Sequence, residues 1–83
     1  MQGSRALAGR LAEQGWVLYT RPGCPFCENQ MQVLGGSYPR SAVCSGESVC
    51  SAGVPTWSNA ASGERRVGFQ DAAALEKMAQ RIA

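Results

Sequence analysis

Hydrophobic residues are spaced differently in successive stretches of this sequence, and the changes in spacing predict its helices and strands. Leu7 and Leu11 lie one helical turn apart in the first stretch, which Ser4 can cap and Gly15 can end. This stretch therefore predicts a helix over residues 4–14. Residues 16–20, Trp-Val-Leu-Tyr-Thr, form a β-prone run without polar alternation, which is typical of a strand covered on both faces. We expect this strand at the centre of a sheet.

The alternation of helices and strands continues through the rest of the chain. Arg21-Pro22-Gly23 breaks the first strand, and a second helix is expected from Cys24 to the glycine pair at 35–36. Asp71 can cap a last helix over 72–82, whose apolar residues recur at helical spacing. Between these two helices the pattern predicts a strand at 40–44, one or two helical turns within 47–52, a strand at 54–58 and its hairpin partner at 65–69.

The order of these elements predicts the fold class. A strand, a helix and a strand in succession imply a parallel pair with a right-handed crossover, and the hairpin adds an antiparallel edge. We therefore expect an α/β fold of three layers, a mixed four-stranded sheet flanked by helices on both faces. Residues 1–83 form one domain, because a chain this short cannot divide its apolar residues between two stable cores.

Composition and charge narrow the classes of function. With 45% hydrophobic residues the chain can bury a core, and we expect a monomer. The formal net charge of +2 comes from eight basic and six acidic residues scattered along the sequence, a pattern that favours neither nucleic acid nor an anionic membrane as a partner. Charged residues interrupt the first 14 positions, so no signal peptide is predicted, and no run is long enough for a membrane span. We expect a cytoplasmic protein, in which paired cysteines are more often catalytic than structural.

The candidate chemistry lies in Cys24-Pro25-Phe26-Cys27, at the start of the second predicted helix. Two cysteines separated by two residues can close a disulfide with little motion, so one sulfur can attack a substrate disulfide and the other can resolve the mixed disulfide. The unpaired amides of a helix N-terminus stabilise a thiolate at Cys24. Pro25 suits the first helical turn, where its missing N–H costs nothing. The pattern predicts Cys24 as the attacking thiol, with positive charge from Arg21 nearby.

Two stretches resemble known proteins. Residues 18–27, Leu-Tyr-Thr-Arg-Pro-Gly-Cys-Pro-Phe-Cys, resemble the segment of glutaredoxins that leads from a strand into the active site, with Phe26 where the dithiol members usually carry tyrosine. Residues 53–57, Gly-Val-Pro-Thr-Trp, resemble the loop of thioredoxin-fold proteins whose proline follows a cis peptide bond. The resemblance implies a thioredoxin-like fold in which Pro55 packs against the cysteine pair. It also implies that the backbone of Val54 pairs with a bound peptide or glutathione like an added strand.

Two further stretches extend the resemblance. Gly68-Phe69-Gln70-Asp71 is similar to the place where glutaredoxins carry two glycines and then an acidic residue that holds glutathione, although Val67 stands in place of the first glycine. Asp71 is equally well explained as a plain helix cap. Residues 27–30, Cys-Glu-Asn-Gln, together with Cys44, Cys50 and residues 53–57, also resemble the thioredoxin-like domains fused to vitamin K epoxide reductase homologues. The residues implied in substrate or glutathione binding are Arg21, Pro25, Phe26, Val54, Pro55, Gly68 and Asp71.

These resemblances imply a glutaredoxin-like thiol-disulfide oxidoreductase that reduces protein or glutathione mixed disulfides. Glutathione is the expected co-substrate, the glutathione or thioredoxin reductase system is the expected electron donor, and no tightly bound cofactor or metal is expected. The alternative from another class is a carrier or sensor of the same fold that holds zinc or an iron-sulfur cluster through Cys24 and the thiols of a partner.

Two more cysteines follow the predicted second strand. If the strand at 40–44 is parallel to the strand at 16–20, Cys44 lies at the same edge of the sheet as the start of the second helix. Cys50 follows after five intervening residues, a span short enough for a disulfide if the two Cβ atoms point together. Three interpretations stay open: inert buried thiols, a second disulfide or redox pair, and metal ligands.

Overall fold

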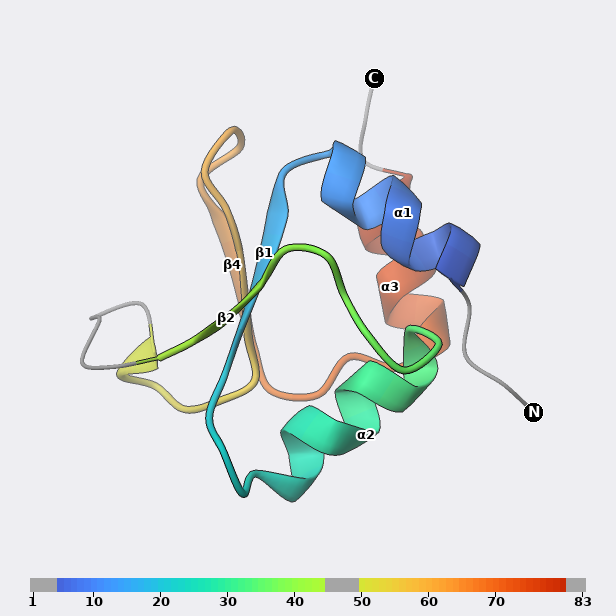
Figure 1. Cartoon of the computed structure of the whole chain (residues 1–83). Coiled ribbons are helices and arrows are strands. Elements are labelled where there is room, and N and C mark those ends of the chain that lie inside the picture. The colour runs from blue at the N-terminus through green and yellow to red at the C-terminus, as the bar shows by residue number, and fades with distance from the viewer. Residues whose placement is uncertain (1–4, 45–49, 81–83) are drawn as a thin grey trace.

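A computed structural model of the chain describes residues 5–44 and 50–80. Figure 1 shows the path of the chain through its helices and strands. Within the described residues the elements are α1 (Arg5–Glu13), β1 (Trp16–Thr20), α2 (Pro25–Val33), β2 (Ser41–Val43), β3 (Thr56–Asn59), β4 (Glu64–Val67) and α3 (Ala72–Ala79).

The four strands form one mixed sheet in the order β2-β1-β3-β4. β1 runs parallel to β2, with Leu18 beside Ser41, and antiparallel to β3, with Leu18 opposite Trp57. β3 and β4 pair as an antiparallel hairpin. The predicted fold class is therefore confirmed: this is a small α/β domain of three helices and a four-stranded mixed sheet, compatible with a thioredoxin-like arrangement. β1 occupies an inner position of the sheet, as its uninterrupted β-prone run predicts.

The hydrophobic core lies on one face of the sheet. Trp16, Leu18 and Trp57 share that face, because alternate residues of a strand point the same way and the register sets Leu18 opposite Trp57. Each of these three side chains is at most 1% exposed. Figure 1 shows α1, α2 and α3 on this same side. The buried residues that complete the core are Leu7, Ala8, Leu11, Leu34, Tyr38, Leu75, Met78 and Ala79.

The opposite face of the sheet differs from the expectation of a helix on each side. No helix described for residues 5–44 and 50–80 packs there, and Val17, Tyr19 and Ser58 are only partly buried. The helical turns expected within 47–52 fall largely outside the described residues, and from Cys50 onward the chain forms a tight turn. The stretch between β2 and β3 is short and rich in serine and glycine, so its described part turns rather than forming a long helix.

Element boundaries differ from the predicted ones where a backbone feature interrupts the pattern. The strand predicted at 54–58 begins at Thr56, because Pro55 has no N–H to donate to the ladder. β4 ends at Val67, since Gly68 adopts φ of 95° and turns the chain. α3 ends at Ala79, with Gln80 as its C-cap, and not at the predicted residue 82. The Ser4 cap and residues 81–82 of that prediction lie outside the described residues. None of the helices in the described part of the chain has the length and apolar character needed to cross a membrane.

Candidate functional site

Cys24 occupies the cap position of α2. Its extended backbone (φ −91°, ψ 110°) directs the sulfur back over the first turn, where the N–H of Cys27 donates a hydrogen bond to Sγ at 3.2 Å. Pro25 is the first helical residue, where it leaves no donor unpaired. The sulfur thus takes the place of the serine or aspartate oxygen that usually caps a helix, in a field that favours negative charge.

The two cysteines of this turn are free thiols with different surroundings. Cys24 is half-buried, whereas Cys27 is buried, with 4% of its surface exposed. Burial raises the pKa of the Cys27 thiol from its ordinary 9.0 to about 11, and the hydrogen bond with Cys24 and the negative charges of Cys24 and Glu28 act in the same direction. One sulfur is therefore accessible to a substrate, and the other is held as a neutral thiol near pH 7.

The raised pKa of Cys27 predicts a loss of stability at high pH. Between pH 9 and 11 the unfolded dithiol chain has released this proton and the folded protein keeps it. The stability that the protonated Cys27 thiol contributes is therefore fully present below pH 9 and is lost as pH rises toward 11, by about 2 kcal/mol at pH 10.5. Urea unfolding of the reduced protein at pH 8 and pH 10.5 measures the loss.

Cys27→Ser is the matched control for this pH dependence, because a serine hydroxyl does not titrate in this range. Burial also raises the pKa of Tyr38, but that contribution is common to both proteins and cancels in their difference. An equal loss of stability in the wild type and the variant would contradict the assignment to Cys27.

A second segment faces Cys24 from across the site. The Val54–Pro55 peptide bond is cis, and the Val54 carbonyl oxygen lies 3.9 Å from the Cys24 sulfur, within reach of its S–H. Gly53 precedes this bond with φ of 127°, a conformation that a side chain would strain. The Thr56 hydroxyl donates a hydrogen bond of 2.6 Å to the Gly53 carbonyl. This segment, residues 53–55, is the proline loop, and it presents a backbone carbonyl to the accessible thiol.

A cavity of about 190 Å³ opens beside the two cysteines. Arg21 and Glu28 place opposite charges at its wall. Its volume is below the 300 to 1,000 Å³ that is usual for pockets enclosing a whole small ligand, so it can accept one side chain while the rest of a bound molecule lies on the surface. Its lining residues are Thr20, Arg21, Pro22, Gly23, Cys24, Cys27, Glu28 and Met31.

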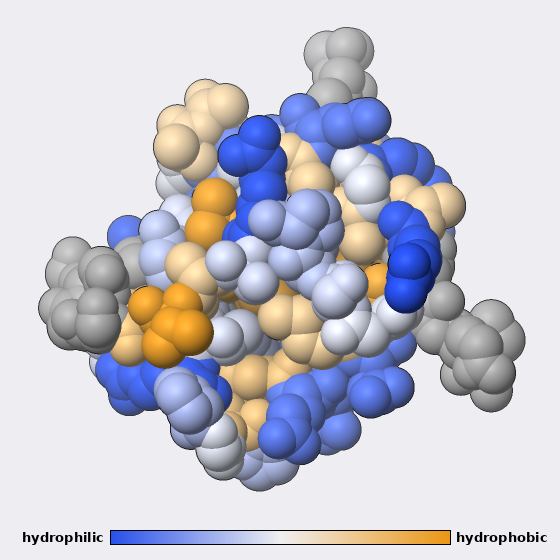
Figure 2. Space-filling model, viewed as in Figure 1, coloured by the Kyte–Doolittle hydropathy of each residue, from blue (hydrophilic) through white to orange (hydrophobic). Residues whose placement is uncertain are grey.

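Large hydrophobic side chains are exposed close to this site. Val43 ends β2 beside Thr20, the last residue of β1, and Val67 ends β4 opposite Thr56. Both therefore lie at the edge of the sheet where β1 leads into the cysteine loop, residues 21–24, and where the proline loop leads into β3. Figure 2 shows hydrophobic atoms gathered over the end of β2. Among the described residues, the large hydrophobic side chains that are 40% to 61% exposed are Phe26, Val43, Val67 and Phe69.

The remaining residues implied in glutathione binding are placed as follows. The N–H of Gly68 donates a hydrogen bond of 2.7 Å to the Pro55 carbonyl, so Gly68 borders the proline loop. Pro25 and Phe26 are exposed at the start of α2. Asp71 caps α3, where its Oδ1 accepts a hydrogen bond of 2.9 Å from the Ala74 N–H. The structure thus groups Arg21, both cysteines and the proline loop, and it uses Asp71 as a cap.

Sequence reasoning missed Gln30, which is 0% exposed in α2. Its Oε1 accepts hydrogen bonds from Trp57 Nε1 at 3.2 Å and from the Gln70 N–H at 2.7 Å, and its Nε2 donates to the Gln70 carbonyl at 2.9 Å. Gln30 therefore joins the cysteine helix to β3 and to the segment before α3. Its position one helical turn after Cys27, on the buried face of α2, is the signal that could have found it.

Cys44 and Cys50 are joined by a disulfide, with their Cα atoms 6.5 Å apart. Of the three interpretations that the sequence left open, the structure shows a disulfide. Within the described residues, no three His, Cys, Asp or Glu side chains come together in a way that could hold a metal ion.

Comparison of the chain with models of protein families, with curated proteins and with solved structures finds no match.

Proposed function

We propose that this protein is a thiol-disulfide oxidoreductase in which Cys24 attacks a disulfide and Cys27 resolves the product. The observation that carries the proposal is the asymmetry between the two thiols at the start of α2. Cys24 is accessible and accepts a backbone hydrogen bond at its sulfur, whereas Cys27 is 4% exposed, and burial raises its pKa to about 11. Such a pair gives one nucleophile and one reserve thiol, which a two-step exchange requires.

The proposed reaction transfers two electrons and two protons. The Cys24 thiolate attacks one sulfur of the substrate disulfide, and a bond between Cys24 and that sulfur forms as the substrate S–S bond breaks. The leaving sulfur takes up a proton. Cys27 then loses its proton and attacks the Cys24 sulfur, which releases the second substrate thiol and leaves a Cys24–Cys27 disulfide. The substrate is reduced and the protein is oxidised.

The proline loop supports the same function. The Val54 carbonyl lies next to the Cys24 sulfur, where an extended peptide that brings its disulfide to Cys24 can pair with the Val54 backbone. The resemblance to glutaredoxins implies this arrangement and adds glutathione mixed disulfides to protein disulfides as substrates. The exposed Phe26, between the two cysteines, favours a protein substrate, because apolar surface beside the reactive thiol matches polypeptide side chains better than charged glutathione.

Electrons reach the oxidised pair from a cellular thiol in this proposal. Glutathione with its reductase and the thioredoxin reductase system are the two donors that the resemblance implies. A cytoplasmic location fits a pair that such donors keep reduced. Arg21, at the wall of the cavity, is the proposed contact for a carboxylate of glutathione or substrate.

A turnover assay with each donor system tests the proposal. The purified protein is supplied with a peptide disulfide or a glutathione mixed disulfide, and NADPH consumption is followed with glutathione plus its reductase or with thioredoxin reductase. Turnover with at least one system, together with loss of two free thiols when the substrate is in excess, is expected. A protein that shows no turnover with either system and binds zinc or an iron-sulfur cluster stoichiometrically would instead favour the carrier or sensor function.

A further inference from the structure

The Cys44–Cys50 disulfide is poorly suited to exchange electrons itself. Cys44 is 7% exposed and Cys50 is 1% exposed. Exchange requires a thiolate to approach a sulfur along the S–S axis, and burial on this scale blocks that approach. The two cysteines therefore have a different part in the molecule from the accessible Cys24, and their neighbours indicate which part.

On one side the disulfide is attached to the strand that leads into the cysteine loop. The N–H of Cys44 donates a hydrogen bond of 2.8 Å to the Thr20 carbonyl. Thr20 is the last residue of β1, and the Thr20 hydroxyl also lies 3.5 Å from the Ala42 carbonyl that accepts from it. Cys44 is thus held against the point where the chain leaves the sheet toward Cys24.

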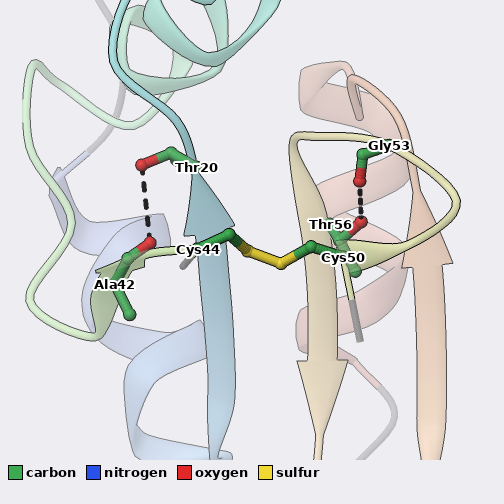
Figure 3. Close-up of a disulfide and its surroundings, with 6 residues drawn as sticks. All are labelled: Thr20, Ala42, Cys44, Cys50, Gly53 and Thr56. Atoms are coloured by element: carbon green, nitrogen blue, oxygen red, sulfur yellow. Dashed lines mark hydrogen bonds between the residues drawn. A yellow bond between two sulfur atoms is a disulfide. The ribbon is translucent and has the colours of Figure 1, made fainter. Parts of the chain in front are cut away.

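On the other side the disulfide is attached to the proline loop. The Cys50 carbonyl accepts a hydrogen bond of 3.0 Å from the Gly53 N–H, and the Gly53 carbonyl accepts one of 2.6 Å from the Thr56 hydroxyl. Val54 follows Gly53 directly, and its carbonyl faces the Cys24 sulfur. Figure 3 shows the disulfide crossing β1 to join the Cys44 side to the segment with Gly53 and Thr56.

We propose that the Cys44–Cys50 disulfide is a positioning element that holds the Val54 carbonyl at its place beside Cys24 and so sets the groove for a polypeptide substrate. This role rests on the proposed oxidoreductase function and deepens it. The bond is not consumed in the reaction. It connects the end of β1 to the proline loop through hydrogen bonds at each of its cysteines.

Loss of the disulfide is expected to affect Cys24 and the proline loop unequally. Cys24 is held by α2 itself, so its sulfur keeps its position and the hydrogen bond from the Cys27 N–H. The segment from 50 to 55 loses its covalent tie to β2, which increases its conformational freedom. Substrates that pair with the Val54 backbone therefore lose a correctly placed partner, whereas small reagents that touch only the Cys24 sulfur do not.

The test compares the wild type with Cys44→Ala/Cys50→Ala on probes of different size. For a peptide carrying a mixed disulfide at a central cysteine, kcat/KM is expected to fall at least about tenfold, mainly through KM, because the carbonyl that pairs with the peptide is displaced. Reduction of hydroxyethyl disulfide and alkylation of Cys24 by iodoacetamide are expected to stay within about twofold. Equal losses on all three probes, or no loss on the peptide, would overturn the positioning role.

A second variant keeps the proposal testable if the double variant does not fold. Thr56→Val leaves the disulfide in place but removes the hydrogen bond to the Gly53 carbonyl, and Ser58→Ala, on the same strand, is its matched control. Selective loss on the peptide for Thr56→Val but not for Ser58→Ala supports the positioning role, and equal behaviour of the two variants overturns it.

The same experiment separates the positioning role from the proposed function. Wild-type protein without Cys24-dependent turnover on any probe would contradict the oxidoreductase function. An active wild type with an equally active double variant would contradict the positioning role alone. Hydrogen exchange at the Gly53 amide gives a readout without activity: it is expected to be faster in the double variant, and unchanged exchange would show that the disulfide does not hold this loop.

Discussion

Replacing Cys24 with serine is expected to lower the rate of disulfide exchange at least about a thousandfold. The substitution removes the accessible sulfur, and Cys27 cannot take over its part. Cys27 is 4% exposed, and its pKa of about 11 keeps nearly all of it protonated at pH 7. The turnover assay described above measures the loss, with circular dichroism to show that the variant is folded.

Cys27→Ser is expected to fail at the second step instead of the first. Cys24 still attacks, so a mixed disulfide between Cys24 and the substrate peptide accumulates, because the thiol that would resolve it is absent. Mass spectrometry under non-reducing conditions detects the adduct, and a reductant releases it. If neither variant forms an adduct and both lose activity equally, the division of labour between the two cysteines is wrong.

Replacing Gln30 with leucine is expected to lower the free energy of unfolding by about 3 kcal/mol. Leucine is close to glutamine in size, but it leaves the Trp57 Nε1–H and the Gln70 N–H without the acceptor that both now use. Each buried donor without a partner costs about 1 to 3 kcal/mol. Urea unfolding measures the change.

Gln32→Leu is the matched control for Gln30→Leu, because Gln32 lies in the same helix and is exposed. Its effect is expected to be within about 0.5 kcal/mol. Similar losses of stability in the two variants would show that helix composition, and not the buried hydrogen bonds of Gln30, explains the result.

Local patterns were enough to predict much of this fold. The run at 16–20 predicted β1 with its observed bounds, because five consecutive β-prone residues between two glycine-containing turns leave little choice. Asp71 was correctly predicted as a cap, since the interaction involves an amide only three residues away. The same holds for the position of Cys24 at the start of α2. These features depend on residues that are close in sequence.

Features that depend on how residues are arranged in space were not predicted in the same way. The partners of Gln30 are 27 and 40 residues away, so no local pattern reveals them. The cis Val54–Pro55 bond was implied by the resemblance, and the residues alone do not determine it. The pairing of Cys44 with Cys50 requires their side chains to meet in space, which spacing alone left open beside two alternatives.

The burial of Cys27 also has a consequence for the lifetime of the covalent intermediate. Burial, the largest cause of the raised pKa of Cys27, persists while a substrate is attached to Cys24, so in the proposed intermediate the resolving thiol stays mostly protonated near pH 7. In the proposed reaction this slows resolution by Cys27, and a free thiol such as glutathione is expected to compete with it for the intermediate. The balance between these two exits, set by the concentration of free thiol, decides whether a bound polypeptide leaves fully reduced or carries its sulfur to a new partner.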